Sequence, residues 1–432
     1  MKLIFDVSDK PKAGQLVVFA LQQMLAILAA TIAVPLIIGK GLTPAAAMFG
    51  AGVGTIVYIL FTKRKSPVFL GSSFAFLGSM AAAFAGGVSM QLGMLGLIVG
   101  AFLAGLVYVV IAIVVKFVGV GWLNKLMPAV VIGPTVAIIG LSLAGNAIGD
   151  LVKGDVTKQV TEYAVSTDSG TPEIIETVSN VPVGSSYVAL ICGLITLAVV
   201  MLCSTYGKKT LRLIPFIIGI LAGYAAAAIF TVIGNICDID ALKIVDFSIF
   251  SSYMLTDGSV SLKTFVSLPD FAFVSGLKGL KEFDFTYFAT IFVAYVPVAL
   301  VVFAEHVADH KNLSSIIDHD LLEEPGLTRT LLGDGVGSIA GALFGGCPNT
   351  TYGESVACVA ITGNASVITI FAAAIGCMLF SFITPLVAFV DSIPACVMGG
   401  VCIALYGFIA VSGLKMIQDA NLDDNRNLFV VS

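Results

Sequence analysis

A succession of apolar segments, each about 20 residues long, constrains the fold of this chain more than any other feature. They lie at about 16–39, 44–62, 67–85, 93–117, 122–149, 186–206, 211–236, 285–310, 327–346, 347–363, 365–390 and 394–414, and a further one begins near Asn427. A helix of about 20 residues crosses the roughly 30 Å hydrocarbon core of a bilayer. Hydrophobic residues make up 58% of the chain and charged residues only 11%, which excludes a soluble globule. The sequence therefore predicts an all-α polytopic membrane protein that is surrounded by membrane lipid.

The positions of Lys and Arg predict how these spans are oriented. Basic residues gather at the N-terminus, with Lys10 and Lys12, and then in every second loop, at 63–65, 116–125, 208–212 and 311–329. Because basic loops remain on the cytoplasmic side, we expect a cytoplasmic N-terminus. The polar, mainly acidic segment Gly149–Ser186 is then expected outside as a loop. No basic patch indicates a nucleic-acid partner.

Two of the apolar segments are poor continuous helices. Pro67–Phe76 and Cys347–Glu354 each place Pro, Gly and hydroxyl residues before a run suited to helix. We expect each to form a short extended strand that leads into a half-helix. They are the third and tenth spans, and an offset of seven spans reverses orientation, so the two halves are expected to be inverted repeats. Interrupted spans in corresponding positions of inverted repeats indicate a transporter's midplane site, although kinked spans that merely pack on neighbours remain the alternative.

Two acidic residues lie four positions apart in the span at 285–310. Glu305 and Asp309 would share one face of a helix. Ionisable residues at membrane depth are costly and by default mark a substrate or proton path. Two carboxylates in one poorly hydrated site favour holding a proton, so we expect proton coupling through Glu305 or Asp309. The alternative is that Asp309, His310 and Lys311 form the solvated, passive end of the span.

A third acidic residue, Glu354, stands at the start of the second half-helix. There it could accept two N–H groups from a planar ligand. The backbone N–H groups of Gly353 and Phe74 could meet carbonyl oxygens of that ligand, and the ring of Phe74 or Tyr352 could stack on it. A flat heterocycle with alternating C=O and N–H groups fits this arrangement, but an amino acid or a carboxylate could use the same donors.

Other motif matches favour structure over chemistry. Gly335, Gly337 and Ala340 have the spacing of a dinucleotide-binding turn, but they lie inside an apolar segment, where small-residue helix packing is expected. The chain has no Walker-A motif, nucleophile elbow or HExxH pair. We therefore expect no enzyme activity, no metal site and no cofactor apart from the proton as coupling ion.

At this point several strings become recognisable together. They are Leu70–Phe76, Ala304–Val307, Asp320–Leu322 with Pro325–Leu327, Pro348–Glu354 and Val397–Gly400. In this order, over essentially the whole chain, they resemble the bacterial nucleobase/ascorbate transporter family. The string Asn349–Glu354 is similar to the uracil branch of that family, whereas xanthine and urate members usually carry a different string.

The resemblance implies inverted 7+7 transmembrane repeats, with short β-strands in the discontinuous spans three and ten. It implies a core domain at 1–120 (spans one to four) and 285–392 (spans eight to eleven). It also implies a gate domain at 121–284 (spans five to seven, with extracellular loops) and 393–432 (span twelve and the start of span thirteen). Two further spans would be missing after Ser432, and a homodimer is possible.

The function that the resemblance implies is proton-coupled uracil import across the bacterial cytoplasmic membrane by alternating access. Glu305 and Glu354 would be the uracil-binding carboxylates, the backbone N–H groups of Phe74 and Gly353 would meet the carbonyl oxygens, and Ala30 would line the pocket. A xanthine or urate permease of the same family, or an uncoupled facilitator, channel or sensor, remains an alternative. An anion exchanger would favour a cation where Glu354 stands.

The sequence departs from the family pattern at identifiable positions. Gln22-Gln23 stands where the first span often has Gln-His, and Asp309 stands where a histidine often follows. Ser355 stands where an Asn is frequent. A histidine-based proton route is therefore in question, and Asp309 is its natural substitute.

Overall fold

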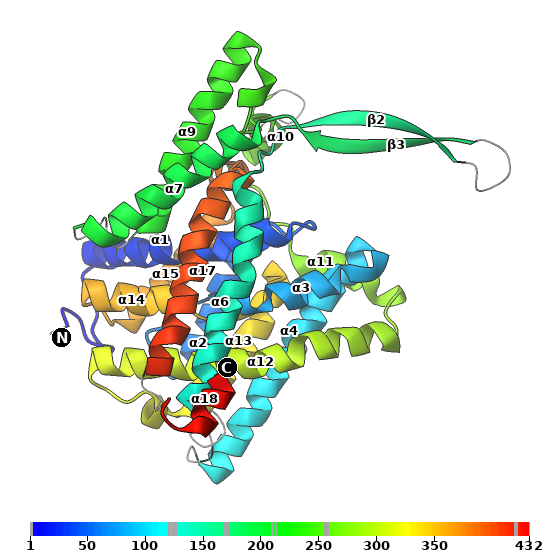
Figure 1. Ribbon diagram of the computed structural model, residues 1–432. Helices are drawn as coiled ribbons and strands as arrows, with labels where there is room; N and C mark the ends of the chain where they lie inside the picture. The colour runs from blue at the N-terminus through cyan, green and yellow to red at the C-terminus, as the bar shows by residue number, and fades with distance from the viewer. Residues whose placement is uncertain are drawn as a thin grey trace.

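The computed structural model describes residues 3–119, 122, 128–166, 173–208, 211, 214–254, 259–418 and 422–431. Helices dominate this part of the chain (Figure 1). Seven of the described helices are long and apolar enough to cross a membrane: α1 (Ala13–Ile38), α2 (Pro44–Phe61), α4 (Met90–Val118), α7 (Ser186–Tyr206), α9 (Pro215–Cys237), α12 (Phe285–Ile317) and α17 (Ala395–Gln418). The chain is accordingly a multi-pass membrane protein.

The remaining described helices are α3 (Leu77–Ala83), α6 (Ala129–Leu151), α10 (Ser248–Met254), α11 (Ala272–Gly276), α13 (Leu327–Gly345), α14 (Gly353–Thr362), α15 (Val367–Phe380), α16 (Thr384–Asp391) and α18 (Asn425–Val431). Short turns of helix lie at η1 (Phe74–Phe76), η2 (Ala85–Gly87), η3 (Asp240–Leu242), η4 (Leu262–Thr264), η5 (Leu277–Lys281) and η6 (Leu322–Gly326). The single span expected at 365–390 is wrong, because the segment divides into α15 and α16. Pro385 stands in the first turn of α16, where proline can begin a helix but could not continue one.

A β-hairpin occupies most of the segment that was expected to be a loop between α6 and α7. Strands β2 (Thr157–Ser166) and β3 (Glu173–Pro182) pair antiparallel, from Thr157 opposite Pro182 to Ser166 opposite Glu173. The hairpin projects away from the helices (Figure 1). Its strands are rich in Val, Ile, Thr and Tyr, which favour extended backbone. The segment expected as an outside loop therefore contains two strands, in addition to the two short strands expected in spans three and ten.

The long helices form two packed groups. A larger bundle contains α1, α2, α4, α12, α13 and α15, and a smaller bundle contains α6, α7, α9 and α17. In the larger bundle α13 packs closely on both α2 and α4: a Cβ added at Gly337 would lie 2.7 Å from the Gly54 oxygen, and one added at Gly335 would lie 2.9 Å from the Gly105 oxygen. Only residues without a side chain permit these approaches. The interpretation of Gly335 and Gly337 as helix-packing positions is confirmed.

Two short buried strands lie inside the larger bundle. β1 (Leu70–Ser72) pairs antiparallel with β4 (Asn349–Thr351), with Gly71 opposite Thr350. The Tyr352 N–H also donates to the Phe69 carbonyl at 3.2 Å, which extends the ladder. Irregular backbone at membrane depth needs such partners because lipid offers none. β1 leads into η1 and α3, and β4 leads into α14, so both strands are followed directly by helix starts.

Candidate functional site

The site is built around the antiparallel pair of β1 and β4. Tyr352 caps the start of α14, and its ring lies directly over Gly71, where an added Cβ would come within 2.3 Å of the ring. Its hydroxyl donates to the Ser72 carbonyl at 2.8 Å. The two strands are therefore locked by a side chain as well as by their ladder. This hydroxyl is already used within the fold, which leaves the ring of Tyr352 for any contact with a ligand.

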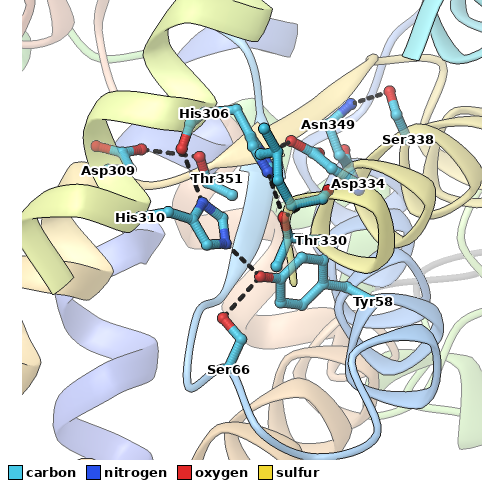
Figure 2. A network of polar contacts seen from close by, with 11 residues as sticks. Tyr58, Ser66, His306, Asp309, His310, Thr330, Asp334, Ser338, Asn349 and Thr351 are labelled. Carbon is cyan, nitrogen blue, oxygen red and sulfur yellow. Dashed lines mark hydrogen bonds and ion pairs between the residues drawn. The ribbon is translucent and has the colours of Figure 1, made fainter. Parts of the chain in front are cut away.

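The predicted carboxylates gather beside this pair of strands. Asp309, on α12, accepts a hydrogen bond from the Thr351 hydroxyl at 2.8 Å (Figure 2). A Cβ added at Gly353 would lie 3.9 Å from Asp309 Oδ1, which brings the first residue of α14 against the same carboxylate. Glu305 and Glu354 are half-buried, and Glu305 is close enough to both Asp309 and Glu354 for electrostatic repulsion. The structure thus brings Glu305, Asp309 and Glu354 together.

Backbone donors accompany these acidic groups. Gly353 is the first residue of α14, and Phe74 is the first residue of η1. The first N–H groups of a helix have no acceptor within it, so both positions can offer a donor to a bound molecule. A helix start also favours a nearby anion. Among the described residues, no three His, Cys, Asp or Glu side chains are grouped to hold a metal ion.

The apolar residues predicted for the site are part of the hydrophobic core. Ala30, Phe74 and Tyr352 are all buried and belong to one hydrophobic cluster. The Phe74 ring packs edge to face on Tyr406 of α17, with centroids 5.6 Å apart and planes at 83°. This aromatic pair is a contact between the larger and the smaller bundle.

Two of the positions that depart from the family pattern meet each other. The Gln23 side-chain amide, on α1, donates to the Ser355 hydroxyl oxygen, on α14. The same oxygen accepts a hydrogen bond from the Phe69 backbone N–H at 3.1 Å. Ser355 therefore ties α1 and α14 to the residue that precedes β1.

A buried polar network around His306, on the adjoining strip of α12, was not predicted. His306 Nδ1 lies 2.6 Å from Asp334 Oδ2, and His306 Nε2 lies 3.1 Å from Thr330 Oγ1 (Figure 2). All of these side chains are buried. The sequence did carry a signal, because Asp334 is an acidic residue within an expected span. Its partner on α12 could not be read from the sequence.

His310 extends this network toward α2. Its Nε2 lies 2.6 Å from the Tyr58 hydroxyl, which lies 2.7 Å from the Ser66 hydroxyl, and its Nδ1 donates to the His306 carbonyl at 2.7 Å (Figure 2). The alternative in which His310 belongs to a solvated span end is wrong, because its side chain is fully buried with both ring nitrogens bonded. Lys311, the next residue, is exposed.

A cavity of about 670 Å³ lies between the two bundles, at the C-terminal end of α1. Its lining includes Lys40, Phe74 and Gly78 from the larger bundle, and Asn146, Asp150 and Lys153 from α6 and the residues that follow it. Phe74 is the predicted site residue that borders it. The cavity therefore reaches one edge of the site.

Solved structures share this fold. The transmembrane domain of a cyanobacterium bicarbonate transporter superposes with a TM-score of 0.66 at 13% identity, covering 99% of this chain and 96% of that chain. The murine Solute Carrier 26 family member A9 anion transporter, in its inward-facing state, superposes with a TM-score of 0.58 at 13% identity, covering 98% of this chain and 63% of that one. At this identity the likeness shows the fold alone.

Sequence relatives are more specific. The chain is 35% identical to a uracil permease of Bacillus caldolyticus over 435 residues (100% of this chain, 86% of the relative). It is 35% identical to a uracil permease of Bacillus subtilis (strain 168) over 433 residues (100% and 87%). It is 32% identical to a uracil permease of Escherichia coli (strain K12) over 428 residues (99% and 85%). The profile described as "Permease family" matches residues 14–432. The chain therefore belongs to this permease family, the nucleobase/ascorbate transporters that include bacterial uracil permeases, and it is a membrane transporter and not an enzyme.

Proposed function

We propose that the chain imports uracil across the bacterial cytoplasmic membrane, coupled to protons, by alternating access. The observation that carries the proposal is the meeting of Asp309, Gly353 and Thr351 beside the paired strands β1 and β4. There a carboxylate that can hold a proton touches the strand and helix start that would hold the substrate. The relatives named uracil permeases support the choice of substrate.

The substrate would lie between the two helix starts. Glu354 and Glu305 would accept the N–H groups of the uracil ring, while the backbone N–H groups of Gly353 and Phe74 would donate to its carbonyl oxygens. Ala30 and the rings of Phe74 and Tyr352 would cover its faces. The half-buried state of Glu305 and Glu354 supports this scheme, because both carboxylates remain accessible to a ligand.

The proton would be carried by Glu305 or Asp309. Two carboxylates in one poorly hydrated site favour holding a proton on one of them. Asp309 accepts a hydrogen bond from the hydroxyl of Thr351, which lies two residues before Gly353. Protonation of Asp309 would therefore alter a hydrogen bond to the strand that positions the substrate's donors, which is a direct physical link between the proton and the substrate.

Alternating access would arise from movement of the core domain (1–120 and 285–392) against the gate domain (121–284 and 393–432). The packing of the long helices into a larger and a smaller bundle supports this division, and the 670 Å³ cavity between them supports access from one side. Inverted 7+7 repeats and a cytoplasmic N-terminus are part of the proposal. In this orientation the cavity faces outward. Membrane lipid would surround the assembly, which could be a homodimer.

Uptake of labelled uracil into proteoliposomes tests the proposal. With an inward-directed proton gradient, uptake by the wild type should be accelerated, and a protonophore should abolish the acceleration. Glu354→Gln should abolish binding and uptake, while Asp309→Asn should retain uracil binding but lose the response to the gradient. Exposed matched controls are Glu282→Gln and Asp270→Asn, which should behave as the wild type.

The same experiment separates the alternatives. Stronger competition by xanthine or urate than by unlabelled uracil would overturn uracil in favour of a purine permease. A rate of uracil uptake by the wild type that neither the proton gradient nor the protonophore changes would indicate a facilitator. Purified protein should also bind uracil in a thermal-shift measurement, so binding and transport are read separately.

A further inference from the structure

A second cavity lies at the opposite end of α1. Its volume is about 350 Å³, and it is enclosed by the N-terminal segment, the last turn of α2 with the residues that follow, and the first turns of α15. Val7, Leu60, Ile368 and Phe371 contribute apolar walls, and Lys10 and Arg64 contribute two cations. None of these residues belongs to the transport site.

The N-terminal segment is held over α15 by backbone hydrogen bonds. The Ala365 N–H donates to the Phe5 carbonyl at 3.0 Å, and the Val367 N–H donates to the Val7 carbonyl at 3.2 Å. The Ser366 hydroxyl donates to the Asp9 carbonyl at 2.6 Å. Lys10 follows directly, so its position above the start of α15 is fixed by the backbone.

The other cation is held by the end of α2. The Arg64 N–H donates to the Ile59 carbonyl at 3.0 Å and the Lys63 N–H donates to the Leu60 carbonyl at 3.2 Å. With φ of +53° at Lys63, this is the turn that commonly terminates helices. The chain therefore folds back over the helix end and holds Arg64 beside the cavity.

The lining of the cavity combines an apolar wall with cationic groups, as the boundary between hydrocarbon and lipid headgroups requires. Leu60 is 61% exposed and Phe371 is 40% exposed, so the apolar wall faces the hydrocarbon that surrounds these spans. Within the described ranges, neither Lys10 nor Arg64 forms an ion pair, whereas the neighbouring Lys65 pairs with Glu324. The nearby carboxylates of Asp6 and Asp9 accept hydrogen bonds from the backbone N–H groups of Val7 and Asp6.

We propose that this cavity binds an anionic phospholipid of the phosphatidylglycerol class. One acyl chain would lie along Leu60, Ile368 and Phe371, and the phosphate would lie between Lys10 and Arg64. With the proposed cytoplasmic N-terminus, this end of α1 lies on the cytoplasmic side, where basic pockets between spans suit such headgroups. A soluble phosphate would satisfy the cations but leave the apolar wall uncovered, so the combination selects a lipid.

Native mass spectrometry of the full chain in detergent tests the proposal, with phosphatidylglycerol or phosphatidylcholine of identical acyl chains added. The wild type should retain phosphatidylglycerol in preference to phosphatidylcholine. The double variant Lys10→Gln/Arg64→Gln should bind phosphatidylglycerol about thirtyfold more weakly, the equivalent of about 1 kcal/mol for each cation. Lys116→Gln/Lys415→Gln removes the same charge from exposed positions outside the cavity and should leave retention unchanged.

A second variant tests the apolar wall without changing charge. Ile368→Trp should fill the groove and reduce phosphatidylglycerol retention, while circular dichroism melting verifies that each variant is folded. Unchanged retention in Ile368→Trp, or equal losses in both double variants, would overturn the site as a lipid groove. Displacement of the lipid by glycerol 3-phosphate would likewise overturn it, because the cavity would then be a site for a free phosphate.

Discussion

The Gln23 side-chain amide donates to the hydroxyl oxygen of Ser355, which lies 332 residues away in the sequence. Both side chains are buried, and the Ser355 oxygen also accepts the Phe69 N–H. Gln23 stands where the family often has a histidine, and Ser355 stands where it often has an asparagine. Two of the departures from the family pattern are thus in direct contact, so a change of residue at one of these positions alters the partner of the other.

Loss of this contact should weaken both the fold and the site. Gln23→Ala and Ser355→Ala should each lower the free energy of unfolding by about 1–3 kcal/mol, because each leaves a buried polar partner unpaired. The double variant should lose less unfolding free energy than the two single variants lose together, since the second change removes a group that has already lost its partner. Thermal unfolding in detergent measures this, with the exposed Gln91→Ala as control. Additive losses would mean that the two side chains act independently.

Gly71 should tolerate no side chain. An added Cβ would lie 2.3 Å from the Tyr352 ring, so Gly71→Ala must displace the residue that caps α14. Overpacking of this kind destabilises by about 1–3 kcal/mol, and the displacement should also reduce uracil binding. The double variant Gly71→Ala/Tyr352→Leu should regain part of the lost stability. Gly78, where an added Cβ meets nothing within 4 Å, provides the control as Gly78→Ala.

The Asp334 carboxylate should matter for stability even though it is not one of the residues proposed to bind uracil. Asp334→Leu removes the acceptor of His306 Nδ1 and should lower the free energy of unfolding by about 1–3 kcal/mol. His306→Leu/Asp334→Leu should be less destabilised than the single Asp334→Leu variant, because no unpaired polar group then remains in the interior. Denaturation of the purified variants provides the comparison. A double variant that is less stable than either single variant would refute the argument.

The spans were predictable because the bilayer imposes their length and composition. The segment expected at 44–62 is the helix Pro44–Phe61, for example. The β2–β3 hairpin was missed because its acidic composition obscures the β-branched residues that form the strands. The division after α15 depends on the position of Pro385, which a hydropathy profile does not register.

The site was predictable only where a residue is unusual for its surroundings. Glu305, Asp309 and Glu354 could be recognised as acidic groups in apolar segments. Their arrangement could not be derived in the same way. Two contacts depend on how α12 packs against distant parts of the chain. They are the hydrogen bond from the Thr351 hydroxyl to Asp309 and the contact between His306 and Asp334.

Asp155 should make stability depend on pH in the acidic range. It lies after α6, outside the spans, and accepts the Ala395 N–H at 3.2 Å. Burial raises the pKa of its carboxyl from 3.8 to about 6, and the charges of Asp246 and Asp150 act in the same direction, although Lys153 pairs with Asp150. Between pH 3.8 and about pH 6, Asp155 holds a proton in the folded chain that it has released in the unfolded chain. Stability should therefore fall as pH rises through this window, by about 3 kcal/mol in total, and should not change further from this group above pH 6.

Melting curves of the wild type and of Asp155→Asn, recorded from pH 4 to 7, isolate this effect. The amide of the variant stays neutral and keeps an oxygen that can accept the Ala395 N–H. The variant should therefore lose less stability than the wild type as pH rises, and the difference between them should grow up to about pH 6. Asp270→Asn changes an exposed carboxylate and should follow the wild type. Parallel curves for the wild type and Asp155→Asn would show that the buried carboxyl does not retain its proton on folding.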